Sequence, residues 1–315
     1  MARADCGGRR LLALGSFVLT AAGERQDLSV SAAATVAFVS NFYFWRAQAS
    51  YFAGPAEWLP LLNMWTLSVE EQFYLIWPLL LALAGAVART TRFRMPAIVA
   101  AVLIILFSAS LAVFLWGAMA KPTAAFYLTP TRMWEFALGG ALALTGGYLH
   151  RLERIAGPAA LIGLAAIVIS IVLLRRGVSF SRTIFPAAFG AAAVIGGVSV
   201  MPASLVGRVL AAAPLVVVGR LSYSWYLWHW PLLALARVYD FGQQSLARDL
   251  LVVVASLGLS ALTYALIENP VRRRKPWPFS GARQTVLVGG GISFAVAGLA
   301  IALYIQADAA AQRDP

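Results

Sequence analysis

The sequence predicts an all-α fold: a polytopic transmembrane helix bundle with about nine spanning helices and one interfacial or re-entrant segment. Two observations support this prediction. Hydrophobic residues make up 61% of the 315 residues and charged residues only 12%, whereas a soluble domain has about 45–50% apolar and about 25% charged residues. The apolar residues also occur in runs of about 20, the length that an α-helix needs to cross a bilayer.

The spanning helices are expected where such runs occur along the chain: residues 62–88, 96–119, 126–149, 155–174, 183–201, 220–238, 249–268 and 284–305. Two earlier runs are ambiguous. Residues 11–22 form a short run, and residues 29–45 end in the aromatic sequence FYFW. The basic stretch at 272–283 is expected to be a loop that anchors the helix before it.

The positions of Lys and Arg predict the orientation, because cytoplasmic loops carry an excess of both. One alternate set of loops contains more of them and is expected to be cytoplasmic, so helix 62–88 runs from outside to inside. If 11–22 and 29–45 both crossed the membrane, Arg9 and Arg10 would lie outside, against this rule. The preferred interpretation is therefore that 11–22 spans and 29–45 is the interfacial or re-entrant segment. A signal peptide ending near Gly23 is the other open interpretation.

Composition also bears on other classes of function. The net charge of +12 is what cytoplasmic loops of a membrane protein produce, so it is poor support for nucleic-acid binding. Cys6 is the only cysteine, which excludes an intrachain disulfide and a cysteine metal site. His150 and His229 are the only histidines. We therefore expect no metal and no bound cofactor.

Two adjacent carboxylates lie in the apolar run NMWTLSVEEQFYLIWPLLL at 63–81. An acid at the bilayer centre costs about 2.5–3.5 kcal/mol and usually marks a site. Adjacent helical positions diverge by about 100°, so Glu70 is expected to share a face with Phe73 and Tyr74 while Glu71 faces elsewhere. The alternative to a site role is a carboxylate that is hydrogen-bonded or ion-paired between helices.

A second motif, TPTRMWEFALGG at 129–140, places an arginine and an acid three residues apart. Arg132 and Glu135 are expected either to pair with each other, as the i, i+3 spacing allows, or to leave Arg132 to pair across the bundle with Glu70 or Glu71.

A third motif, RLSYSWYLWHWPLL at 220–233, contains five aromatic residues that indicate an interfacial belt. His229 lies deep in its helix, and an imidazole can transfer a proton near neutral pH. The alternative is a hydrogen-bonded packing residue. In ALIENPVRRR at 265–274, Glu268 is expected to pair with the arginines at 272–274, and Pro270 is expected to end the helix.

These motifs, in this order, resemble the acyltransferase-3 family of bacterial membrane O-acyltransferases. The resemblance covers residues 9–275, and residues 276–315 add a basic loop and an extra transmembrane helix. It is carried by SNFYFW (40–45), NMWTLSVEEQFYLIWP (63–78), RMWEFALGG (132–140), SYSWYLWHWPLL (222–233) and ENPVRRR (268–274). The chain is most similar to the subgroup that modifies surface polysaccharides such as the O-antigen of lipopolysaccharide.

The resemblance implies a membrane enzyme that moves an acyl group, often acetyl, from cytoplasmic acyl-CoA to a hydroxyl of a cell-surface glycan. The bacterial inner membrane is the expected location. Glu70 would handle a proton or orient the acceptor, and Arg132 would pair with an anion. Cytoplasmic arginines could hold the phosphates of CoA, although the charge rule already explains them. The catalytic candidates are Glu70, Glu71, Tyr74, Arg132, Glu135 and His229.

Two features of the family have no counterpart in this sequence. The family begins with two more helices, with an arginine before the first and a histidine within it that is assigned the acid/base role. The subgroup that this chain resembles ends in an extracytoplasmic SGNH domain. A partner could supply the missing helices, or His229 could replace the missing histidine if it faced the same cavity.

The sequence is also compatible with two other classes of function. A transporter or flippase for a lipid-linked sugar would also bury acids among helices, but neither an inverted repeat nor paired broken helices is found in the sequence. An inactive truncated membrane subunit is the other alternative. The expected partners are acyl-CoA, a glycan or lipid-linked sugar acceptor and membrane lipids, with no nucleic acid.

Overall fold

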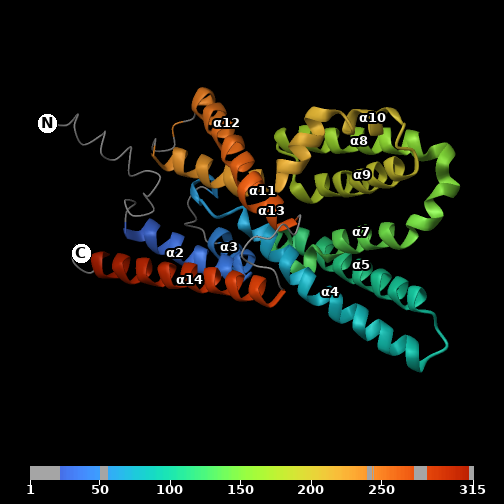
Figure 1. The fold of residues 1–315 in the computed structure, drawn as a ribbon, viewed down its shortest axis with the longest axis horizontal. Coiled ribbons are helices and arrows are strands. Elements are labelled where there is room, and N and C mark those ends of the chain that lie inside the picture. The colour runs from blue at the N-terminus through green and yellow to red at the C-terminus, as the bar shows by residue number, and fades with distance from the viewer. Residues whose placement is uncertain (1–21, 50–55, 240–242, 244, 273–281, 312–315) are drawn as a thin grey trace. The chain divides into compact units, whose positions relative to one another are not determined.

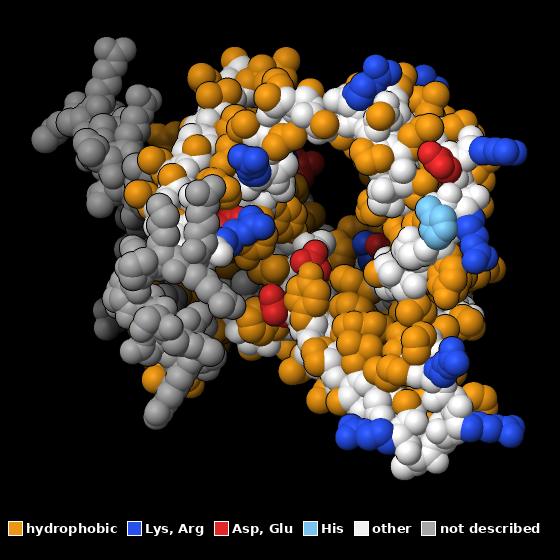
Figure 2. Space-filling view, turned by 45° about the vertical axis from the view of Figure 1, so that its right-hand side comes forward, with side chains coloured by type: hydrophobic (Ala, Val, Ile, Leu, Met, Phe, Trp, Pro, Cys, Tyr) orange, Lys and Arg blue, Asp and Glu red, His pale blue; other side chains and the backbone are white. Residues whose placement is uncertain are grey.

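The computed structural model describes residues 22–49, 56–239, 243, 245–272 and 282–311. The regular elements within these residues are all helices, which confirms the all-α prediction (Figure 1). Hydrophobic side chains dominate the face seen in Figure 2, as expected of helices that face lipid. Arg9, Arg10, Cys6 and the predicted span at 11–22 up to residue 21 lie outside the described residues, as does most of the basic stretch at 272–283.

The chain divides into two compact units: unit 1 comprises residues 1–68 and 224–315, and unit 2 comprises residues 69–223. Helices α4 (Met64–Thr90) and α11 (Ala213–Tyr239) contribute residues to both. The other helices of unit 1 are α2 (Ala22–Val36), α3 (Ser40–Ala49), η3 (Ala56–Trp58), α12 (Leu246–Thr263), the π-helical turn η6 (Tyr264–Glu268), α13 (Asn269–Arg272) and α14 (Ala282–Ala311).

Unit 2 is built from helices that follow one another closely along the chain. They are α5 (Met95–Ala120), α6 (Pro122–Tyr127), the 3-10 turn η4 (Thr129–Thr131), α7 (Met133–Thr145), the 3-10 helix η5 (Gly146–Leu152), α8 (Glu153–Arg175), α9 (Phe180–Val200) and α10 (Leu205–Leu210). In this unit α5 lies beside α7, and α8 lies beside α9 (Figure 1).

Five helices within the described residues are long and apolar enough to cross a membrane. Four of them coincide with the predicted spans at 62–88, 96–119, 183–201 and 249–268. The fifth, Met133–Arg175, runs through α7, η5 and α8 and contains the predicted span at 155–174. Helix α11 is not among the five, and the apolar part of α14 is shorter, at Phe294–Gln306. The membrane bundle is thus supported, while the count of about nine spans stays a prediction.

The predicted single helix at 126–149 is wrong, because the structure divides this stretch among α6, η4, α7 and η5. Pro130 has no N–H, and its ring clashes with the carbonyl one turn earlier. Leu128 is extended, with φ −82° and ψ 139°, and it ends α6 and caps the 3-10 turn η4 that contains Pro130. Helix α7 then begins anew at Met133.

Pro270 does not end its helix, contrary to the prediction. The chain passes from α12 through the π-helical turn η6 into α13. The amide of Asn269 donates to the carbonyl of Tyr264, five residues back. This wider turn replaces the ordinary α-helical bonds just before Pro270, so the proline falls in the first turn of α13, where a missing N–H is tolerated.

The segment predicted to be interfacial or re-entrant forms two short helices, α2 and α3, which a turn at Phe38 separates. Phe38 has φ 56°, and its N–H and that of Val39 donate to the carbonyls of Thr35 and Ala34, as in a Schellman motif. Neither helix reaches the length of about 20 residues that a span requires. Helix α2 lies along α14 within unit 1 (Figure 1).

Helices α8 and α9 pack so closely that two glycines are required at their contact. A Cβ atom at Gly163 would lie 2.5 Å from the carbonyl oxygen of Gly190, and one at Gly190 would lie 2.6 Å from the carbonyl oxygen of Gly163. Small residues at helix contacts in a membrane let the backbones approach and gain van der Waals contact.

We expect Gly163→Ala to destabilise this helix pair, because the added methyl group overlaps the backbone oxygen of Gly190. Overpacking of this kind costs about 1–3 kcal/mol. The matched control is Gly258→Ala in α12, where nothing lies within 4 Å of the Cβ position. Thermal unfolding in detergent micelles should show a lower midpoint for Gly163→Ala only. Equal midpoints for the two variants would contradict the close contact.

Candidate functional site

The helix break at residues 128–132 gathers polar side chains inside unit 2. The hydroxyl of Thr131 lies 2.9 Å from the carbonyl oxygen of Ala125 and 2.6 Å from that of Leu128, and it donates to both. The hydroxyl of Ser110 in α5 donates to the carbonyl of Pro130 at 2.7 Å and accepts the N–H of Trp134 at 2.9 Å. Side chains thus replace backbone bonds that the break interrupts, which an apolar environment requires.

Arg132 and Glu135 form an ion pair directly after this break. Arg132 Nε lies 3.0 Å from Glu135 Oε1, and the two side chains are only 15% and 26% exposed. The guanidinium also lies over the ring of Phe180, 5.0 Å from its centroid, a favourable cation–π contact. Of the two predicted arrangements, the structure therefore contains the one in which Arg132 and Glu135 pair with each other. Neither Glu70 nor Glu71 pairs with Arg132 in the described part of the chain.

Helix α4 meets this region through Gln72 and Phe73. The hydroxyl of Thr129 donates to Gln72 Oε1, and the ring of Phe73 stacks on that of Phe136 with centroids 4.5 Å apart. These contacts place one face of α4 against η4 and α7 within unit 2. The break, the ion pair and this face of α4 therefore form one polar region lined by aromatic rings.

The two adjacent carboxylates of the apolar run at 63–81 lie in the first turns of α4. Glu70 and Glu71 are both partly buried, and neither makes a hydrogen bond or ion pair with any residue that the structure describes. Phe73 is only 9% exposed, whereas Tyr74 is 56% exposed. The spacing predicts that Phe73 and Tyr74 share one face of the helix. In the structure Tyr74 does not share the buried environment of Phe73, because adjacent helical positions point about 100° apart.

His229 belongs to unit 1 and is partly buried on α11. Its Nδ1 atom lies 2.9 Å from the carbonyl oxygen of Trp225, one helical turn earlier. Its ring centroid lies 5.7 Å from that of Tyr226. This hydrogen bond is compatible with a histidine that only packs and with a histidine that takes part in a site.

The aromatic residues around His229 are more than an interfacial belt, because the indole N–H groups of three tryptophans are bonded within unit 1. Trp225 donates to the hydroxyl of Ser256 and Trp228 to that of Thr263, both at 2.9 Å. Trp230 donates to the carbonyl of Leu59 at 2.9 Å. These bonds join α11 to α12 and to the connector that precedes α4.

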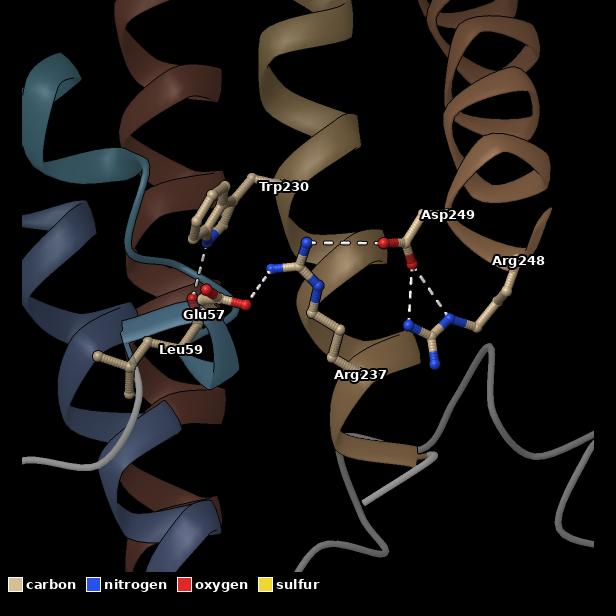
Figure 3. A network of polar contacts seen from close by, with 6 residues as sticks. All are labelled: Glu57, Leu59, Trp230, Arg237, Arg248 and Asp249. Carbon is tan, nitrogen blue, oxygen red and sulfur yellow. Dashed lines mark hydrogen bonds and ion pairs between the residues drawn. The ribbon is translucent and has the colours of Figure 1, made fainter. Parts of the chain in front are cut away.

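That connector, residues 56–63, is fixed at both of its ends. At the start, Arg237 lies 2.7 Å from Glu57 and 3.7 Å from Asp249, and Arg248 lies 2.9 Å from Asp249 (Figure 3). At the far end, the side chain of Asn63 donates to the carbonyl of Tyr226 at 2.8 Å. The hydroxyl of Tyr226 in turn donates to the carbonyl of Asn63 and lies in hydrogen-bonding contact with the hydroxyl of Thr66.

The predicted pairing of Glu268 is confirmed. Its carboxylate accepts from Arg272 at 3.1 Å and from the hydroxyl of Ser224 at 2.9 Å. Each of its two carboxylate oxygens thus has a partner, as the interpretation of Glu268 as an ion-paired residue requires. Among the described residues, no group of three or more His, Cys, Asp or Glu side chains could hold a metal ion.

Several polar residues that make these contacts were not predicted from the sequence. In unit 2 they are Gln72, Ser110, Thr129 and Thr131, and in unit 1 they are Asn63, Thr66, Tyr226 and Arg237. The Thr-Pro-Thr sequence at 129–131 was a usable signal, because a proline in an apolar run leaves carbonyls that neighbouring hydroxyls can satisfy. Arg237 gave no signal, since its partners are distant in the sequence.

Comparison with known proteins gives a family match over most of the chain. The family model described as "Acyltransferase domain" matches residues 14–265. This range contains the polar region of unit 2, the contacts between α11 and the connector in unit 1, and all six candidate residues. No solved structure matches the chain.

The similar curated proteins are bacterial. The chain is 31% identical over 253 residues to YrhL of Bacillus subtilis, provisionally named a peptidoglycan O-acetyltransferase; the match covers 75% of this chain and 38% of YrhL. It is 28% identical to the peptidoglycan O-acetyltransferase OatA of Listeria monocytogenes, covering 79% and 41%. It is 31% identical to BcsY of Komagataeibacter xylinus, provisionally named a membrane-bound transacylase, covering 78% and 60%. The chain thus spans less than two thirds of each relative.

We expect the buried pair in unit 2 to be energetically coupled. Arg132→Gln and Glu135→Gln each leave one charge partly buried without its partner, which costs about 1.5–3 kcal/mol for a charged hydrogen bond. The double variant should be less destabilised than the sum of the two single variants. Chemical unfolding in micelles measures this double-mutant cycle. Strictly additive losses would show that the pair contributes no coupling.

Proposed function

Because the chain belongs to the acyltransferase family, we propose that it is a membrane O-acyltransferase that transfers an acyl group, specifically acetyl, to a hydroxyl of a cell-surface glycan. The single observation that carries this proposal is the family match over residues 14–265. The names of similar proteins, which are O-acetyltransferases of peptidoglycan and a membrane-bound transacylase, support the reaction and the class of acceptor.

The proposed donor is acyl-CoA, and the proposed location is the bacterial inner membrane. In the reaction the acceptor hydroxyl loses its proton, its oxygen forms a bond to the acyl carbon, and the carbon–sulfur bond of the thioester breaks. The thiolate leaves and takes up a proton. The protein has to supply a proton acceptor, stabilise negative charge on the acyl oxygen and exclude water.

Roles for the candidates in unit 2 follow from their environments. Glu70 handles a proton or orients the acceptor, because its carboxylate is partly buried and makes no hydrogen bond or ion pair with the described residues. Arg132 pairs with an anion, and Glu135 orients Arg132 through the 3.0 Å ion pair. Glu71 and Tyr74 are retained as site candidates, with Tyr74 on the outward side of α4.

We expect Glu70→Gln to lower the rate of acyl transfer by about 10²–10⁴-fold if the carboxylate handles a proton. The measurement is transfer of radiolabelled acetyl from acetyl-CoA to glycan in membranes that contain the full chain. Glu153→Gln is the matched control, because Glu153 is an exposed acid in the first turn of α8.

The outcomes separate the proposals. An unchanged rate in Glu70→Gln would remove the role of Glu70 and leave the proposed activity intact. Absence of transfer and of acetyl-CoA consumption by the unaltered chain would instead reject the activity. Movement of a lipid-linked sugar without acetyl-CoA consumption would point to transport.

A further inference from the structure

The part of α11 around His229 is attached to the connector both before and after His229 along the chain. Tyr226, Trp230 and Arg237 are spaced by four and seven residues, so they lie on one stripe of the helix. This stripe contacts the connector in reverse order: Arg237 binds Glu57, Trp230 binds the carbonyl of Leu59, and Tyr226 binds Asn63. His229 lies between the second and third of these attachments along α11, three residues after Tyr226 and one before Trp230.

The hydrogen bond of His229 sets its tautomer. A carbonyl oxygen can only accept, so the 2.9 Å contact with Trp225 requires the proton to be on Nδ1. In the neutral ring Nε2 then carries a lone pair and no proton. A hydrogen bond of this kind orients an imidazole and decides which nitrogen does chemistry.

The other nitrogen is left for a ligand. No residue that the structure describes forms a hydrogen bond or ion pair with Nε2 of His229. Nε2 is also not one of the fully buried side-chain atoms that lack a partner within the described residues, so a ligand can reach it. The ring of His229 is partly buried and lies nine residues, about 13 Å at 1.5 Å per residue, into the helix from Arg220.

We infer that His229, and not Glu70, is the base that deprotonates the acceptor hydroxyl in the reaction proposed above, with Nε2 as the accepting atom. The inference rests on that proposed function. The O–H bond of the acceptor breaks and its proton moves to Nε2, while the acceptor oxygen bonds to the acyl carbon of the thioester. The carbon–sulfur bond breaks, and the departing thiolate takes the proton from Nε2, which restores the neutral ring.

The carbonyl of Trp225 has a defined part in this step. It keeps Nδ1 protonated before the reaction and accepts a stronger hydrogen bond from the imidazolium that forms when Nε2 takes the proton. Tyr226 is a positioning residue, because its hydroxyl attaches this turn of α11 to Asn63 and Thr66.

The tautomer can be measured without any activity assay. The chain has only two histidines, and His150 is an exposed residue of η5. The full chain carrying His150→Gln and labelled with ¹⁵N-histidine therefore has a single imidazole. Long-range ¹H–¹⁵N spectra should show Nδ1 protonated and Nε2 bare at neutral pH. A ring protonated on Nε2 would overturn the inference.

The kinetic arm uses the acetyl-transfer assay. His229→Gln is expected to lower kcat by about 10²–10⁴-fold, the contribution of a general base, with the KM for the acceptor unchanged. His150→Gln should match the unaltered chain. Tyr226→Phe should lower kcat less than His229→Gln does and should keep the Nδ1-protonated tautomer.

These outcomes distinguish the inference from the function on which it rests. Transfer by the unaltered chain together with an unchanged kcat in His229→Gln rejects the base and keeps the activity. No transfer by the unaltered chain rejects both. If His229→Gln does not elute as a folded protein from size-exclusion chromatography, the tautomer measurement on the native side chain still decides the inference.

Discussion

A backbone polar group that loses its helical partner inside an apolar bundle costs several kcal/mol, and this constraint accounts for the polar contacts at the break in unit 2. The hydroxyl of Ser110 bridges the carbonyl of Pro130 and the amide of Trp134, and Thr131 serves two further carbonyls. Without these bonds the chain could not leave the helix at Leu128 and begin again at Met133.

The same break decides where charge can be buried. Arg132 immediately precedes the new helix and Glu135 lies in its first turn, so each reaches the other at 3.0 Å while Phe180 covers the guanidinium. A continuous helix at 126–149 would have kept the same spacing but without the hydroxyl-lined interruption beside it. The break therefore creates the polar region to which the proposed anion-pairing role of Arg132 belongs.

In unit 1 the side chains of the aromatic motif on α11 form the hydrogen bonds that hold the helices together. Tryptophan combines a large apolar body with one N–H donor that needs a partner when it is buried. Trp225, Trp228 and Trp230 find theirs in Ser256, Thr263 and the carbonyl of Leu59. These bonds, with the ion pairs of Arg237, fix the turn that carries His229. One motif thus provides both the anchoring of the helix and the chemistry proposed for it.

The sequence by itself determined the all-α membrane class, the helices at five of the predicted spans, the family and the local pairs Arg132–Glu135 and Glu268–Arg272, because composition, run length and i, i+3 or i, i+4 spacing are local properties. Pro130 is a local signal for the interruption within 126–149, but only the tertiary structure decided that the hydroxyls of Ser110 and Thr131 satisfy it and that the chain continues helically past Pro270. It also placed Tyr74 outward and bound Tyr226 and Arg237 to the connector. These features depend on which hydroxyl, carbonyl or acid from a distant segment lies within hydrogen-bonding reach, and spacing along one helix does not contain that information.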